Sequence, residues 1–138
     1  MSALVLDSEA LSSLARNSVH ERTVRAALAA AIDEAAEVAV PAAALAELYR
    51  GGHHDQAVDS CLAREGGISI VPTDRSLARR IGHLLAAVHR GSQHHVDAAV
   101  VAVCAAAGGG VVLTADVKDI SALAGTSLHV SVRSIARS

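Results

Sequence analysis

Five short apolar segments alternate with helical segments, and this order constrains the fold more than any other feature of the sequence. The expected strands cover residues 4–6, 38–40, 68–71, 111–113 and 128–132. The first expected helix begins after Asp7 or Ser8 and ends near residue 16. The others cover residues 23–37, 42–50, 54–64, 74–89, 95–107 and 116–124. Strands that alternate with helices in this way form a mainly parallel sheet. The sequence therefore predicts an α/β fold with a sheet of about five strands.

Composition limits the character of the core and the location of the chain. Of the 138 residues, 51% are hydrophobic and 1% aromatic, so small and branched side chains must fill the interior. No repeat or linker divides the chain, and one domain over residues 1–138 is expected. No apolar stretch reaches the roughly 18 residues of a membrane span, and the N-terminus lacks the basic region of a signal peptide. Cys61 and Cys104 form no CxxC pair. We therefore expect a cytoplasmic protein with reduced thiols and no membrane association.

Four acidic residues stand beside segments that the pattern places in the core: Asp7, Glu47, Asp97 and Asp116. Asp7 follows the first expected strand, and Asp116 follows the fourth. Asp97 lies in the first turn of the helix before that fourth strand, and Glu47 lies about two turns into an apolar helix. Ligands of open parallel sheets bind at the carboxyl ends of the strands, where the strand order reverses. If the first and fourth strands are neighbours, these acids face one crevice.

Four adjacent carboxylates cannot all stay ionised without compensation. An all-oxygen ligand set favours Mg²⁺ or Mn²⁺ over zinc, and such ions suit hydrolysis of phosphodiesters by activating a water and stabilising charge on the attacking and leaving oxygens. Each acid also has an ordinary structural interpretation. Asp7 and Asp116 are suited to capping helices, Asp97 to interacting with a positive helix end, and Glu47 to facing water.

The segments around these acids resemble the PIN-domain ribonucleases, and most closely the VapC-type toxins of bacterial toxin–antitoxin pairs. The motifs that carry the resemblance lie at residues 4–8, 40–48, 96–99 and 113–119, in the same order as in that family. The resemblance covers nearly the whole chain. It implies a three-layer α/β/α fold and Mg²⁺- or Mn²⁺-dependent endonuclease cleavage of RNA. It also implies a homodimer and a cognate antitoxin that covers the active site.

The resemblance also implies a role for each matching residue. Asp7, Glu47, Asp97 and Asp116 would be the catalytic, metal-binding acids. Asp119 matches a position that is often acidic and acts through water, Thr114 matches a supporting hydroxyl, and Ser8 matches a small hydroxyl residue after the first acid. Glu9 departs from the family pattern, since it either increases repulsion in the pocket or faces water.

Basic and histidine residues are secondary candidates for binding a substrate. Four arginines cluster late in the chain, Arg75, Arg79, Arg80 and Arg90, and guanidinium groups suit phosphate, although a solvated helix face is an equally ordinary interpretation. Tyr49 is the only residue among Phe, Trp and Tyr, so base stacking is a poor model for RNA binding. The histidine pairs at residues 53–54 and 94–95 lack the spacing of a zinc site; we expect surface or loop positions, with the second pair close enough to Asp97 to touch a phosphate.

Two other functions fit the sequence. One is a PIN nuclease that processes RNA without an antitoxin. The other is a non-catalytic α/β binding module in which the acids serve only as helix caps.

Overall fold

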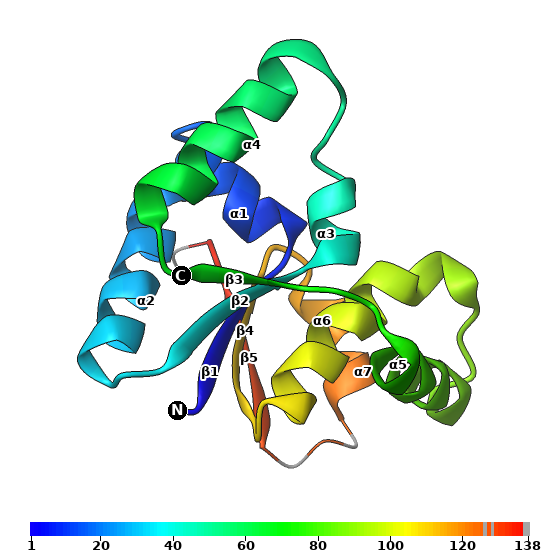
Figure 1. Cartoon of the computed structure of the whole chain (residues 1–138). Helices are drawn as coiled ribbons and strands as arrows, with labels where there is room; N and C mark the ends of the chain where they lie inside the picture. Colours follow the sequence, from blue (N-terminus) through cyan, green and yellow to red (C-terminus); the bar gives the residue numbers. More distant parts are fainter. Residues whose placement is uncertain (126, 128, 137–138) are drawn as a thin grey trace.

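A five-stranded, entirely parallel sheet forms the centre of the computed structural model, which describes residues 1–125, 127 and 129–136 (Figure 1). The strands are β1 (Ala3–Leu6), β2 (Glu37–Pro41), β3 (Ile68–Val71), β4 (Gly110–Thr114) and β5 (Val130–Ser134). Their spatial order is β3-β2-β1-β4-β5. All five expected strands are present. The last begins later than predicted, at Val130, and Leu128 lies outside the described residues.

Helices cover both faces of the sheet and make the three-layer α/β/α arrangement that was predicted. They are α1 (Ser8–Ala15), α2 (Glu21–Asp33), α3 (Ala42–Ala46), α4 (Gly52–Glu65), α5 (Arg75–Ala87), α6 (His95–Ala106) and α7 (Val117–Ala124), with a 3₁₀ turn, η1 (Ser92–His94), before α6. Figure 1 shows α1, α2 and α4 on one side of the sheet and α5, α6 and α7 on the other. No helix within the described ranges is both long and apolar enough to cross a membrane.

Two helices end earlier than the sequence predicts. Helix α2 stops at Asp33, four residues short of the expectation, because Ala35 takes a left-handed conformation (φ 55°) and Glu37 already pairs in β2. Helix α3 stops at Ala46, because the N–H of Glu47 bonds to the carbonyl of Ala44, three residues back, and the α-helical ladder is lost. Glu47 therefore lies at the end of a short helix, not two turns inside a longer one.

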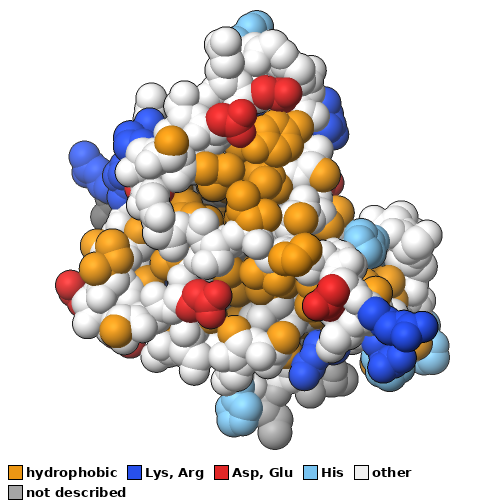
Figure 2. Space-filling view, in the orientation of Figure 1, with side chains coloured by type: hydrophobic (Ala, Val, Ile, Leu, Met, Phe, Trp, Pro, Cys, Tyr) orange, Lys and Arg blue, Asp and Glu red, His pale blue; other side chains and the backbone are white. Residues whose placement is uncertain are grey.

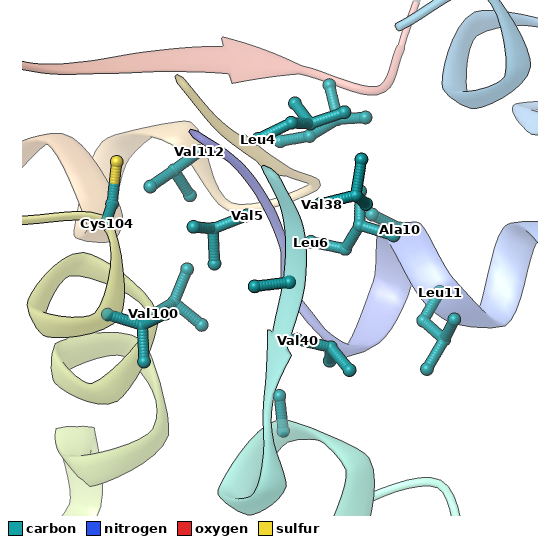
Figure 3. Close-up of a cluster of buried hydrophobic side chains, with 14 of the residues drawn as sticks. Leu4, Val5, Leu6, Ala10, Leu11, Val38, Val40, Val100, Cys104 and Val112 are labelled. Atoms are coloured by element: carbon teal, nitrogen blue, oxygen red, sulfur yellow. The ribbon is translucent and has the colours of Figure 1, made fainter. Parts of the chain in front are cut away.

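The core is built around β1 and α6. Every residue of β1 is buried, and so is each residue of α6 from Ala98 to Cys104, which confirms the predicted central position of this helix. Side chains of β1 alternate between the two faces (Figure 3): Val5 lies on the side of α6 with Val100, and Leu6 lies on the side of α1 with Leu11. Small residues in α6 let this helix approach the sheet closely.

Gly110 is required where β4 begins beside β1. Its φ of +143° is accessible to glycine, and a Cβ at this position would overlap the backbone of Ala3. This close approach sets the pairing of β1 with β4, in which Ala3 is opposite Gly110 and Leu6 is opposite Leu113.

Candidate metal-binding site

The strand order reverses between β1 and β4. From β1 the chain continues to β2 on one side and later returns to β4 on the other. Asp7 directly follows β1, and Asp116 comes two residues after β4. The two acids therefore lie at the edge of the sheet where open α/β sheets bind their ligands.

Asp7 joins the ends of β1 and β4 through both oxygens of its carboxylate. Its Oδ1 accepts a hydrogen bond from the N–H of Ala10 at 2.8 Å and so caps α1, and its Oδ2 accepts one from the hydroxyl of Thr114. The Thr114 oxygen accepts a bond from the N–H of Asp116 at 2.8 Å. Asp7 is 6% exposed. Burial raises the pKa of Asp7, and the bonds from Thr114 and Ala10 oppose that rise.

Ser8 and Glu47 bring a third element to the same edge. The Ser8 hydroxyl, in the first turn of α1, donates to Oε1 of Glu47 at 2.9 Å. The position of Glu47 at the end of α3 thus comes from a contact with α1 and not from helical periodicity. Glu9 is exposed, and its charge makes the smallest contribution to the raised pKa of Asp7.

Asp97 lies near enough to the other acids for their charges to raise its pKa. The pKa of Asp97 is raised to about 6, first by burial and then by the negative charges of four other acids: Asp116, Asp119, Asp7 and Glu47. Like charges raise the pKa of a carboxyl group only when they lie near it. The structure thus gathers all four predicted acids, together with Asp119, into one acidic cluster beside the first turn of α6.

Arg90 and His94 lie beside Asp119 in this cluster. Arg90 donates from Nη1 to Oδ1 of Asp119 at 3.2 Å, and this bond lowers the pKa of Asp119. His94, Asp97 and Asp119 each have one potential ligand atom, and these three atoms lie within 4.8 Å of one another. His94 lies in the turn before α6, close to Asp97, as expected for the second histidine pair, but its proximity to Asp119 was not predicted. The three-residue spacing of His94 and Asp97 at a helix start was the available indication.

Three of the four predicted arginines lie away from the pocket. Arg75, Arg79 and Arg80 are exposed on α5, where Figure 2 shows basic side chains gathered. Arg80 lines a surface pocket of about 270 Å³ together with Ala105 of α6. Ala105 is eight residues beyond Asp97, or about 12 Å along the helix at a rise of about 1.5 Å per residue. Arg90 alone among the four contacts an acid of the pocket.

The donor set fits a divalent cation. Five carboxylates form one cluster. Burial and then repulsion from the other four acids raise the pKa of Asp97, and a cation would relieve that repulsion. Burial and hydrogen bonds hold Asp7, the acid that joins the ends of β1 and β4, so the pocket is partly preformed.

Comparison with known proteins identifies the class to which this fold and site belong. The PIN domain family matches residues 4–125, and the chain belongs to that family. The predicted recognition of a PIN domain is confirmed. No curated protein matches the sequence.

A solved structure shows the same fold. A chain in the crystal structure of VapBC2 from Rickettsia felis, bound to a DNA fragment from their promoter, superposes with a TM-score of 0.68 at 13% identity. The match covers 96% of this chain and 98% of that one.

Proposed function

We propose that this PIN-domain protein is a metal-dependent endoribonuclease that acts as the VapC-type toxin of a toxin–antitoxin pair. The observation that carries the proposal is the convergence of four acids on Asp97, whose pKa is raised by burial and by their negative charges. Membership of the PIN family and the similarity to a chain of VapBC2 support the same function.

Asp7, Glu47, Asp97 and Asp116 are the residues that would hold Mg²⁺ or Mn²⁺. When bound, the ion supplies activation of a water and neutralisation of charge on the scissile phosphate. The remaining roles belong to the chain. Thr114 holds the carboxylate of Asp7 in place, Ser8 positions Glu47, and Asp119 adds a fifth carboxylate beside Asp97.

RNA would be bound through its backbone. Arg75, Arg79 and Arg80 are exposed on α5, and Arg80 lines a pocket with Ala105, further along α6 than Asp97, so we assign them to phosphates that flank the cleavage site, not to the scissile phosphate. The single tyrosine is not free for stacking, because its hydroxyl donates to Asp59 at 2.6 Å and the ring packs on the core.

An antitoxin and a second copy of the chain are the proposed protein partners. Strand β3 is an edge strand, and Ile70 in its middle is 48% exposed. Figure 2 shows apolar side chains gathered between α4 and this strand. An exposed apolar edge of this kind supports association with a protein partner.

Cleavage of RNA in the presence of Mg²⁺ or Mn²⁺ tests the catalytic proposal, with Asp7→Asn compared against Asp74→Asn. The two aspartates are matched: each caps a helix by accepting from a backbone N–H at 2.8 Å, and Asp74 lies at the start of α5, away from the pocket. We expect Asp7→Asn and Asp97→Asn to lose at least about 100-fold of the activity, as on removal of a metal ligand or its support, and Asp74→Asn to keep it.

Equal cleavage by all variants, or no effect of EDTA, would reject the site. No cleavage by the wild type with either ion would favour a non-catalytic module whose acids are caps. The toxin assignment has its own test. Induction of the wild type in a bacterium should stop growth and fragment cellular RNA, and Asp97→Asn should do neither. Cleavage in vitro without growth arrest would instead favour an RNA-processing nuclease.

A further inference from the structure

We infer that His94 supplies a nitrogen ligand to the divalent ion, so that the pocket is a mixed imidazole–carboxylate site which prefers Mn²⁺ to Mg²⁺. This inference rests on the proposed function, because it concerns the same pocket. It goes beyond that proposal by adding a ligand of different chemistry and a metal preference.

The distances allow one ion to contact His94, Asp97 and Asp119 together. Their ligand atoms lie within 4.8 Å of one another. Nitrogen and oxygen ligands lie about 2.0–2.2 Å from such metals, so two ligands on opposite sides of one ion are at most about 4.4 Å apart. Side-chain movements of a few tenths of an ångström close the difference.

The backbone directs His94 into the pocket. It ends the 3₁₀ turn η1 and is the N-cap residue of α6, with its N–H bonded to the carbonyl of Gly91 at 3.1 Å. Asp97 follows three residues later, which places both side chains on one side of the helix start. His94 is half-buried, and its ring makes no hydrogen bond to any other residue that the structure describes. Its ring nitrogens are therefore available to a metal.

Arg90 does not exclude an ion from this position. It contacts Oδ1 of Asp119, which leaves Oδ2 of that carboxylate without a hydrogen bond among the described residues. Arg90 pairs with one of the five acids, so the cluster around Asp97 keeps a negative charge.

One imidazole changes the metal preference of an oxygen site. Mg²⁺ takes oxygen ligands and loses its waters reluctantly, whereas transition-metal ions accept imidazole nitrogen. Mn²⁺ combines that acceptance with tolerance of carboxylates and water, so it suits a pocket with one nitrogen and several oxygens.

Pulsed electron paramagnetic resonance of the Mn²⁺-loaded protein tests the inference directly. Nitrogen-14 modulation from a coordinated imidazole should be present in the wild type and in His95→Ala, a control at the neighbouring half-buried histidine, and absent in His94→Ala. Bound Mn²⁺ without nitrogen coupling in the wild type would reject the inference and leave the proposed nuclease intact. A wild type that binds no Mn²⁺ would reject both.

Calorimetric titration gives an independent readout. We expect His94→Ala to weaken Mn²⁺ binding by about 10-fold or more, to weaken Mg²⁺ binding by less than about 3-fold, and to leave the melting temperature without metal within about 2 °C of the wild type. Equal losses for both ions would mean that His94 only positions the carboxylates.

Discussion

Replacement of Asp97 by asparagine should stabilise the metal-free protein. Asparagine has nearly the same shape and removes the charge that four neighbouring acids repel. The pKa of about 6, against 3.8 for an unperturbed aspartate, corresponds to about 3 kcal/mol at neutral pH, at about 1.36 kcal/mol per pH unit. Water around a half-exposed group reduces this to about 1–2 kcal/mol, and loss of the favourable interaction with the N-terminus of α6 removes about 0.5 kcal/mol. A net gain of about 1 kcal/mol remains.

This gain must depend on pH in one direction. Because the pKa of Asp97 is higher in the folded protein than in the unfolded chain, its ionisation destabilises the fold fully above about pH 6, and the effect disappears as pH falls toward 3.8. The advantage of Asp97→Asn over the wild type should therefore be largest at pH 7 and absent near pH 4.

Thermal unfolding in EDTA at pH 7, 5.5 and 4.5 measures this difference. We expect Asp97→Asn to melt about 3–5 °C above the wild type at pH 7 and within about 1 °C of it at pH 4.5. Glu37→Gln is a control that removes one negative charge at the start of β2, the opposite end of the strands from the acids. Its melting temperature should differ little from that of the wild type at all three pH values. A destabilised Asp97→Asn at pH 7, or an advantage that grows as pH falls, would refute the reasoning.

Two further substitutions test the joint between β1 and β4. Thr114→Val removes a fully buried hydroxyl that donates to Asp7 and accepts from Asp116. Urea unfolding should show a free energy of unfolding about 2–3 kcal/mol lower than that of the wild type. The exposed control Thr73→Val should lower it by less than about 0.5 kcal/mol. Gly110→Ala should destabilise by at least about 2 kcal/mol, because its Cβ overlaps Ala3 and its φ is unfavourable. Gly82→Ala, in open space on α5, should instead stabilise by about 1 kcal/mol; similar effects of the two alanines would contradict the close approach.

Most of the fold was predicted from the sequence, because apolar runs and glycines mark most of its strands and helix ends. Apolar runs marked all five strands, and Gly66 marked the end of α4, where it takes the left-handed φ of 68°. The predicted ends of α2 and α3 were wrong. Ala35 adopts a positive φ although alanine gives no indication of it. Glu47, just after α3, bonds to Ser8, a contact between segments 39 residues apart that no local pattern predicts.

The site was predictable to the extent that strand order was. Asp7 and Asp116 lie at strand ends, so topology alone gathers them, and Asp97 is placed by the first turn of α6. His94 was not predictable in the same way. Its proximity to Asp119 depends on how η1 and α7 pack, which no local pattern encodes. The same packing separates Arg90, which contacts Asp119, from the three arginines of α5.

The hydrogen bond between Asp7 and Thr114 spans 107 residues of sequence, and this has a consequence for synthesis. The first acid of the cluster leaves the ribosome long before its partners on β4 and α7. Until β4 inserts beside β1, the carboxylates are far apart and repel one another weakly. The chain therefore acquires its acidic cluster only after β4 and α7 have been synthesised, and a fragment that ends before residue 110 cannot contain it.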